Sequence, residues 1–290
     1  MTRVIVTGGS GKAGRACIED LLRHGYEVMN VDAVPPPVNQ CPFVQVDLAD
    51  FGQAFEALSE VDSRYRGAEA IVHLAAIPAP GRQTNAVTFK NNILSTYNVF
   101  EASRRLGLRN VVWASSETVL GLPFETPPPY VPVDEEYPGR PETAYSLSKL
   151  LGEEMAKHFC RWDPELKIIG LRFSNVMEPH DYARFAGFDE DVQLRKWNLW
   201  GYIDARDAAQ AVRKSLEVPI KGAEIFIIAN ADTVMSRANA LLMAEVFPGV
   251  PFKGQVGANE TLLSIEKARR LLGYEPQHGW RETRLQRPAP

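Results

Sequence analysis

The sequence predicts an α/β protein built on a doubly wound parallel sheet. Apolar runs, the first at Arg3–Thr7, alternate with segments of helical period over much of the chain. The run Ala70–Ala76 is apolar except for one histidine, which is typical of a strand buried on both faces of a parallel sheet. Strands that alternate with helices connect through right-handed crossovers, so we expect helices on both faces of the sheet.

A glycine-rich turn joins the first strand to the first helix. Gly8 permits a tight turn, Gly11 lets the backbone approach a pyrophosphate, and Gly14 lets helix and strand pack closely. The helix N-terminus offers N–H groups and a positive dipole to phosphates. The first two glycines are spaced G-x2-G rather than G-x-G, yet the order of strand, turn and helix predicts a Rossmann-type dinucleotide site. The predicted cofactor contacts in this turn are Gly8, Gly11, Lys12, Ala13 and Gly14.

Asp32 predicts which dinucleotide binds. It ends the second predicted strand, Glu27–Val31, and lies 18 residues after Gly14, near the spacing of about 20 expected for the acid that binds the adenosine ribose hydroxyls. A carboxylate at this position repels the 2′-phosphate of NADP and therefore favours NAD. Lys12 and Arg15 are two cations in the same turn that could offset this preference.

The remaining elements follow in alternation. Helices are predicted where apolar residues recur on one face, and Thr84–Leu106 is the longest of them, ended by Gly107. Asp204 supplies an N-cap for another. The further predicted strands are Phe43–Val46, Ala70–Ala76, Asn110–Ala114, Lys167–Phe173 and Ala223–Ile228. The predicted helices after the first are Ala49–Leu58, Thr84–Leu106, Glu142–Asp163, Asp204–Leu216, Ser236–Val246 and Ser264–Leu272.

Two stretches do not fit this alternation. Leu122–Pro141 contains seven prolines, which exclude a helix or a central strand. Because tyrosines and apolar residues are interspersed, we expect an ordered loop over the mouth of the active site. Ser174–Tyr202 is expected to be irregular.

The domain boundaries follow from this pattern. We predict a dinucleotide-binding Rossmann domain over residues 1–175 and a small, mixed substrate-binding portion over 176–290. The second portion is expected to combine an insert at 176–203 with a C-terminal part at 222–290, while helix 204–216 returns to the Rossmann domain.

Composition narrows the class of protein. The 290 residues are 45% hydrophobic and 23% charged, as expected for a soluble globular chain, and the net charge of −4 argues against nucleic acid as a partner. The sequence has no apolar run of about 18 residues, so no membrane span is predicted. The first predicted strand begins at Arg3, so we expect no signal peptide. Cys17, Cys41 and Cys160 are few and far apart, which predicts neither disulfides nor a metal site and suggests the cytoplasm. His73 lies inside an apolar run and is interpreted as a core residue.

A tyrosine and a lysine carry the predicted chemistry. Tyr145 and Lys149 lie four residues apart on a predicted helix and so project from one face. A phenol is a poor base at neutral pH, but a neighbouring ammonium and a nicotinamide cation stabilise the phenolate. Tyr145 could then take the proton of a substrate hydroxyl while hydride leaves to NAD, and Lys149 could also hold the nicotinamide ribose. Ser115 and Ser116 come directly after the strand Asn110–Ala114, at its C-terminal end, where a hydroxyl can hold the substrate oxygen.

Several further stretches complete a family pattern. With them the chain resembles the extended short-chain dehydrogenase/reductase family, in its NAD-dependent epimerase/dehydratase group. The matching stretches are Thr7–Arg15, Asp32, Asp47-Leu48, His73–Ala76, Asn91–Ile93, Ser115–Gly121, Tyr145–Lys149, Leu171–Val176, Tyr202–Ala209 and Leu272–Pro276.

The resemblance implies roles for particular residues. Ser116, Tyr145 and Lys149 would be the catalytic triad, with Asn92 (or Asn91) supporting the active-site helix. It also implies a homodimer through the helices at 84–106 and 142–163. The further cofactor contacts implied are Asp47 and Leu48 beside the adenine and Leu74, Ala75 and Ala76 along the cofactor.

The insert points to a small substrate. Only the 27 residues Val176–Tyr202 separate Asn175 from Ile203, which is short for holding a nucleotide and is similar to the uronate dehydrogenase subgroup that acts on free sugars. In that subgroup an arginine followed five residues later by tryptophan meets the sugar acid, and Arg195 and Trp200 match. An arginine fork suits a carboxylate. The chain departs from the subgroup at Pro78 and Glu117, so a neutral aldose or another sugar alcohol stays open. The predicted substrate contacts are Ser115, Ser116, Glu117, Asn175 and Arg195.

The sequence thus predicts an NAD-dependent enzyme that oxidises a hydroxyl of a free sugar or sugar acid. The alternative is a nucleotide-sugar 4-epimerase with tightly bound NAD, in which hydride returns to the opposite face of a keto-sugar. A non-catalytic NAD-binding protein is a third interpretation, which the presence of both Tyr145 and Lys149 disfavours.

Overall fold

The chain folds around one parallel sheet of seven strands. The computed structural model describes residues 2–59 and 67–281. The strand order is β3-β2-β1-β4-β5-β6-β9, and every neighbouring pair in it is parallel. The strands are β1 (Arg3–Thr7), β2 (Glu27–Asp32), β3 (Phe43–Gln45), β4 (Ala70–His73), β5 (Asn110–Ser116), β6 (Lys167–Phe173) and β9 (Gly222–Ile228). The predicted fold class is therefore confirmed.

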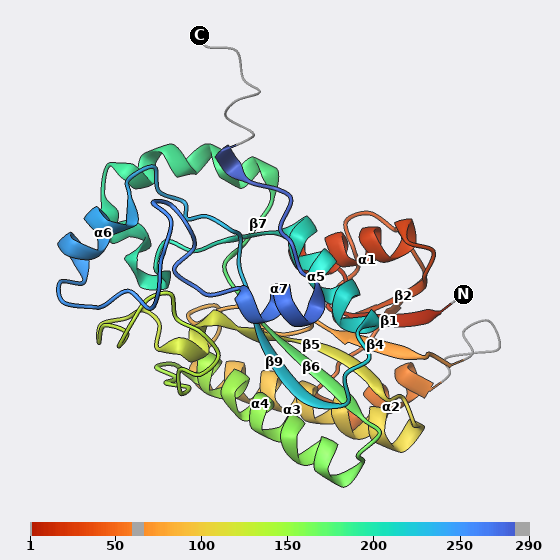
Figure 1. The fold of residues 1–290 in the computed structure, drawn as a ribbon. Coiled ribbons are helices and arrows are strands. Elements are labelled where there is room, and N and C mark those ends of the chain that lie inside the picture. The colour runs from red at the N-terminus through yellow and green to blue at the C-terminus, as the bar shows by residue number, and fades with distance from the viewer. Residues whose placement is uncertain (1, 60–66, 282–290) are drawn as a thin grey trace.

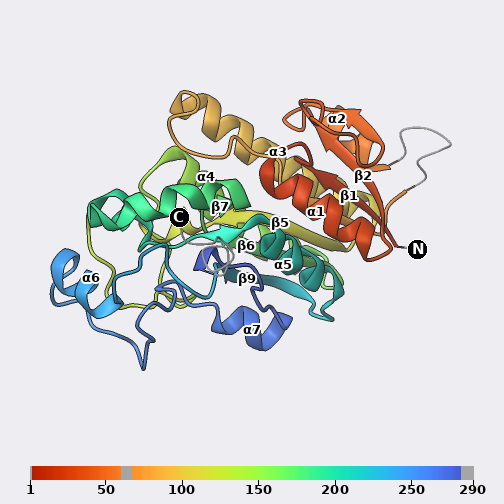
Figure 2. The ribbon, with the colours of Figure 1, turned by 90° about the horizontal axis from the view of Figure 1, so that it is seen from above.

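Helices cover both faces of the sheet, as Figures 1 and 2 show. On one face lie α1 (Lys12–Arg23), α5 (Ala205–Glu217) and α7 (Glu266–Leu272). On the other lie α2 (Phe51–Ser59), α3 (Asn85–Leu106) and α4 (Ala144–Trp162).

Strand β1 explains why two separate apolar cores form. Val4 and Val6 point into the core beneath α1 and α5, whereas Ile5 points into the core beneath α3 and α4. Successive side chains of a strand point to opposite faces, so the three consecutive apolar residues of β1 serve both cores.

The predicted C-terminal part includes the edge strand of the sheet. The expected substrate-binding part at 222–290 begins with Gly222–Ile228, but these residues form β9, the edge strand that pairs with β6 along its whole length. The C-terminal part outside the sheet therefore begins after Ile228. Helix α5 does return to the Rossmann core, where Arg213 on it donates to Asp20 on α1 at 2.8 Å.

The insert is more regular than expected. It contains the short strands β7 (Val176–Met177) and β8 (Ile203–Asp204), which pair with each other, and two 3-10 helices, η2 (Pro179–Asp189) and η3 (Val192–Asn198). The sequence did not predict these two strands and two 3-10 helices, because their apolar and aromatic residues are short runs without a helical period. The C-terminal helix α6 (Asn239–Val246) is shorter than the predicted Ser236–Val246.

The proline-rich stretch is an ordered loop, as predicted. Val131 forms a bridge with Phe252, and Val133 forms one with Leu263. The end of the loop is also hydrogen-bonded to the segment after β5, where the Arg140 N–H donates to the Val119 carbonyl at 2.8 Å. The insert, this loop and α6 gather beyond the carboxyl ends of the strands (Figure 2).

Two bulk predictions can be compared with the structure. Cys17, Cys41 and Cys160 are all free thiols. Among the described residues, no helix has both the length and the apolar character needed to cross a membrane.

Candidate active site

The glycine turn leaves the N-terminus of α1 open to an anion. Gly8 has φ +73°, and a Cβ on Gly14 would lie 2.1 Å from the Gly8 carbonyl oxygen, so both positions require glycine. Gly11 is the N-cap of α1, no side chain caps that end, and the first turn holds no acid. A Cβ on Gly11 would approach only the Gly8 carbonyl oxygen, at 3.4 Å. The first N–H groups of α1 therefore face a surface that a phosphate can approach.

Asp32 is fixed in place beside this turn. One carboxylate oxygen accepts the Ser10 N–H at 3.0 Å, and the other accepts the Val34 N–H at 3.3 Å. These bonds hold the carboxylate at the carboxyl end of β2, and lone pairs remain for the ribose hydroxyls.

The two cations of the turn point to the insert. Lys12 donates to Asp181 at 2.5 Å, and Arg15 donates to Glu178 at 2.8 Å. In this structure, then, the Lys12 side chain that was predicted to contact the cofactor is engaged with an acid of η2.

The other predicted cofactor residues lie along the same sheet edge. Asp47 and Leu48 follow β3, while Leu74, Ala75 and Ala76 follow β4 next to β1. Asn92 on α3 accepts the Ile77 N–H at 2.8 Å and donates to the Ile77 carbonyl at 3.1 Å. Asn92 therefore holds the loop after β4, which borders the site.

The predicted triad converges on the carboxyl end of β5. Ser116 ends β5, and Tyr145 and Lys149 lie on the first turns of α4, which starts at a capping box made by Thr143 and Ser146. The Lys149 ammonium donates to the Ala114 carbonyl at 2.6 Å and lies 5.8 Å from the centroid of the Tyr145 ring. All three triad side chains are less than a tenth exposed.

Burial shapes the charges of this triad. Burial raises the pKa of Tyr145 to about 12, a hydrogen bond with Ser116 lowers it, and the charge of Glu117 raises it. Burial also lowers the pKa of Lys149 to about 8. Without a bound cation the tyrosine is thus a proton donor, so it needs further positive charge to act as a base near neutral pH.

His73 is a core residue, as the sequence predicted. Its Nδ1 lies 2.7 Å from the Thr7 hydroxyl and its Nε2 lies 3.4 Å from the Thr96 hydroxyl. Burial and then the nearby charge of Lys149 lower the pKa of His73 to about 3, so the ring is neutral.

Ser115 does not serve the role predicted for it. Its hydroxyl donates to Glu153 on α4 at 2.6 Å, and Glu153 also accepts two bonds from Arg172 on β6, each at 2.8 Å. Adjacent residues of a strand point to opposite faces, so Ser115 turns away from the side on which Ser116 meets Tyr145. Ser115 therefore fastens β5 to α4 and β6 in this structure.

The three other predicted substrate residues lie in one cluster, in which Glu117 and Arg195 are buried and Asn175 is half-buried. Glu117 accepts a bond from the Ser174 hydroxyl at 2.6 Å and one from the Asn198 amide at 3.1 Å. Arg195 donates to Asn175 at 2.9 Å, and its Nε is buried without a partner. Burial raises the pKa of Glu117 to about 7, although the bonds from Ser174 and Asn198 and the charge of Arg195 all lower it.

Several partners in these clusters have no signature in the sequence. Glu178 and Asp181 accept bonds from glycine-turn cations that lie more than 160 residues earlier in the sequence. Asn198 donates to Glu117, which lies 81 residues earlier. Arg195 lies between the rings of Phe188 and Trp197, at 5.3 and 4.9 Å from their centroids. Trp200, which matched the subgroup pattern, is fully buried and donates to the Val192 carbonyl at 2.9 Å.

Together, the fold and the site define a dinucleotide-binding α/β protein with a Ser–Tyr–Lys centre. Residues 4–229 match the model of the NAD dependent epimerase/dehydratase family. The chain therefore belongs to this family, as its motifs predicted, and the cofactor of the family is NAD. The uncapped start of α1, the open space at Gly11 and the fixed Asp32 carboxylate fit that cofactor.

Individual relatives are similar over part or all of the chain. The chain is 32% identical to UDP-glucose 4-epimerase 2 of Arabidopsis thaliana over 194 residues, covering 61% of this chain and 53% of that protein. A solved structure titled as a mutated uronate dehydrogenase matches 98% of this chain and 85% of its own length, with a TM-score of 0.70 and 23% identity. The UDP-glucose 4-epimerase of Thermotoga maritima, solved with UDP-glucose, matches 97% and 96%, with a TM-score of 0.71 and 22% identity.

These matches differ in how much of each protein they cover. The chain spans about half the length of the curated relatives that it matches. The two structural matches, both below 25% identity, show a shared fold.

Proposed function

We propose that this protein is an NAD-dependent oxidoreductase that removes hydride from a hydroxyl-bearing carbon of a free sugar or sugar acid. The observation that carries the proposal is the convergence of Ser116, Tyr145 and Lys149 at the carboxyl end of β5, on the sheet edge where the glycine turn lies. Open α/β sheets bind ligands at this edge.

The proton and the hydride have separate destinations. Ser116 holds the substrate oxygen by a hydrogen bond, and Tyr145 takes the proton of the hydroxyl. Bound NAD would supply the acceptor for the hydride of the same carbon and a positive charge next to Tyr145. The Lys149 ammonium lies 5.8 Å from the centroid of the Tyr145 ring. Burial raises the pKa of Tyr145 to about 12, so the positive charge of bound NAD would have to lower it toward the working pH.

The packing of the insert supports a small substrate. Its aromatic side chains are used internally, since Tyr182, Phe185 and Trp200 are all buried in the core. Arg195 keeps one buried N–H without a partner, which suits an anionic group on the substrate. The charge of Glu117 is turned to Ser174 and Asn198 and lies near Arg195, so it opposes a sugar acid less than its position in the sequence suggested.

A nucleotide-sugar 4-epimerase is a second candidate, and it has support of its own. The curated relative named above is, by its name, a UDP-glucose 4-epimerase. The same triad would then remove and return a hydride on one bound sugar, without net change of NAD.

The two candidates separate in one assay. The purified protein is given NAD with a panel of free aldoses, uronates and sugar lactols, and separately UDP-glucose, while NADH absorbance and sugar products are followed. The proposal predicts net NADH with at least one free sugar, and about a thousandfold lower kcat in Tyr145→Phe. Tyr26→Phe is the matched control, because Tyr26 is hydrogen-bonded to Glu217 on the outer side of α5.

Other outcomes assign the function differently. Conversion of UDP-glucose without net NADH, together with no turnover of free sugars, would favour the epimerase. A Tyr145→Phe protein that keeps every measurable function would favour the non-catalytic interpretation.

We further infer a homodimer through α3 and α4. These helices lie side by side on one face of the sheet, and Val87, Tyr97, Leu147 and Leu151 on them are each more than a third exposed. A second copy would cover these apolar side chains. Sedimentation at micromolar concentration tests the dimer, and Leu151→Glu is expected to lower the observed mass; a monomeric wild type would contradict it.

A further inference from the structure

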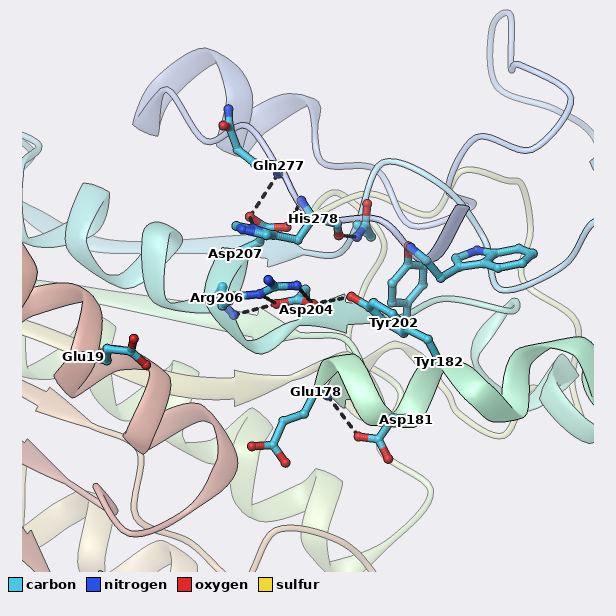
Figure 3. Close-up of polar contacts among 12 residues, drawn as sticks. Glu19, Glu178, Asp181, Tyr182, Tyr202, Asp204, Arg206, Asp207, Gln277 and His278 are labelled. Atoms are coloured by element: carbon cyan, nitrogen blue, oxygen red, sulfur yellow. Dashed lines mark hydrogen bonds and ion pairs between the residues drawn. The ribbon is translucent and has the colours of Figure 1, made fainter. Parts of the chain in front are cut away.

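Four charged side chains join the glycine turn to the insert. Lys12 pairs with Asp181, and Arg15 pairs with Glu178, while Lys12 also lies 3.9 Å from Glu178. We call these four side chains the ionic clasp. Figure 3 shows Glu178 and Asp181 side by side, with the Glu178 N–H donating to the Asp181 carboxylate at 3.0 Å.

The clasp holds Arg15 at both ends of its guanidinium. One Nη donates to the Ser10 carbonyl at 2.9 Å, and the other donates to Glu178 at 2.8 Å. Ser10 in turn gives its N–H to Asp32. Ser10 therefore lies between the Arg15 guanidinium and the Asp32 carboxylate, the group proposed to bind the adenosine ribose. Both Nη atoms of Arg15 already have an acceptor.

This arrangement bears on the choice between NAD and NADP. The 2′-phosphate of NADP carries about two negative charges and binds where an arginine fork or a lysine is free to meet it. In this chain the two cations nearest to Asp32 along the glycine turn already have carboxylate partners. Around them lie Arg184, which donates to Asp181 at 2.8 Å, and the exposed imidazole of His180, whose Nε2 is 3.9 Å from a Glu178 carboxylate oxygen.

We propose that Glu178, assisted by Asp181, is a determinant of cofactor specificity. Glu178 competes with a 2′-phosphate for Arg15, and Asp181 competes for Lys12. The preference for NAD then has two parts: Asp32 repels the phosphate, and the clasp withholds the cations that would attract it. Glu178 and Asp181 act through Arg15 and Lys12, so they are positioning residues.

The test measures binding of reduced cofactors and needs no substrate. NADH and NADPH are titrated, with their fluorescence as the readout, into Asp32→Ser, Asp32→Ser/Glu178→Gln and Asp32→Ser/Glu178→Gln/Arg15→Ala. We expect the double variant to bind NADPH about tenfold more tightly than Asp32→Ser does, with NADH affinity nearly unchanged. The Arg15→Ala change is expected to remove that gain. A steeper loss of NADPH affinity with salt should accompany the gain, because a freed cation then meets the phosphate.

A matched control separates the clasp from general surface charge. Glu19 (Figure 3) pairs with Arg23 and lies on α1, the helix that also carries Arg15. Glu19→Gln in the Asp32→Ser background removes the same charge without touching the clasp, so its NADPH affinity should stay at the Asp32→Ser value.

Three results would overturn the proposal. They are an unchanged NADPH affinity in the double variant, a gain that survives Arg15→Ala, and an equal gain from Glu19→Gln. If Glu178→Gln lowers the melting temperature so far that it cannot be assayed, Asp32→Ser/Asp181→Asn frees Lys12 instead and is expected to move NADPH affinity in the same direction. Because both cofactors are measured by binding, the outcome does not depend on the proposed substrate.

Discussion

Two regions of the molecule reach their folded positions by different means. The first half, as we call it, is the Rossmann region around the glycine turn, and the second half is the insert at 176–203 together with the segment after β9. The first half depends on neighbours in sequence: β1 serves two apolar cores, and Gly8 and Gly14 let α1 follow it closely. The second half comprises the insert and the segment after β9, and depends on polar side chains that reach across the sequence. Local pattern therefore encodes the first half, and long-range hydrogen bonds fasten the second.

The start of α5 is where the second half is fastened. Asp207 has no exposed surface and accepts the Gln277 N–H at 3.0 Å, the His278 N–H at 2.9 Å and a contact from the His278 ring at 2.8 Å. Asp204, one turn earlier, accepts from Tyr182 of the insert and from Arg206. Figure 3 shows both acids between the insert and the C-terminal segment. Two carboxylates thus add long-range polar contacts to the apolar packing of these segments, in which Phe185, Tyr202 and Trp280 are buried.

The largest effect on stability is expected from a substitution in the first half, at Gly14. Gly14→Ala places a Cβ 2.1 Å from the Gly8 carbonyl, so the turn must open. We expect the free energy of unfolding to fall by about 3 kcal/mol, at the upper end of the cost of over-packing, and NAD binding to be lost. Denaturant unfolding and NADH titration measure the two effects.

Gly11→Ala is the control that separates folding from binding. A Cβ there meets only the Gly8 carbonyl at 3.4 Å, and Gly11 has φ −76°, which alanine adopts freely. Gly11→Ala should keep its stability to within about 1 kcal/mol while NAD affinity drops, because the new methyl group lies where the pyrophosphate approaches. Equal destabilisation of both variants would show that the turn is constrained only by its own packing.

A smaller effect is expected in the second half, at Asp207. Asp207→Asn puts an amide NH2 where a carboxylate accepts two backbone N–H groups, so at least one donor loses its partner. The cost of an unsatisfied buried group predicts a loss of about 2 kcal/mol. Hydrogen exchange should rise first at residues 275–281, while NADH affinity stays near the wild-type value. A uniform rise across β1 and α1 would instead mean that the two halves unfold as one unit.

The same contrast explains what the sequence could predict. The strands, the glycine turn, Asp32 and the Tyr145–Lys149 pair all follow from short-range spacing and residue type, and they fall where expected. The 3-10 helices of the insert and the pairing of Ser115 with Glu153 were not predicted, and that pairing depends on a partner 38 residues away along the chain. Glu117 shows what the sequence cannot predict. The sequence places it next to Ser116, but only the structure shows that Ser174, Asn198 and Arg195 surround its carboxyl group.

Glu117 also joins the two halves, and its titration gives the smallest predicted effect. Burial raises the pKa of Glu117 from 4.5 to about 7, so between these values the folded protein binds more protons than the unfolded chain does. The stabilising contribution of the protonated carboxyl is complete below about pH 4.5 and is lost as the pH rises through about 7. The free energy of unfolding should therefore fall over this window with a contribution of at most about 1.4 kcal/mol per pH unit from this group.

Glu117→Gln tests this directly, because glutamine keeps an acceptor for Ser174 and does not titrate. Its unfolding free energy, measured by denaturant at several pH values from 4.5 to 7.5, should fall less steeply than that of the wild type. Glu19→Gln, an exposed change on α1, should follow the wild-type slope. Parallel slopes for Glu117→Gln and the wild type would show that the carboxyl is ionised throughout this range. In that case the bonds from Ser174 and Asn198 and the charge of Arg195, which all favour the carboxylate, would outweigh the cost of its burial.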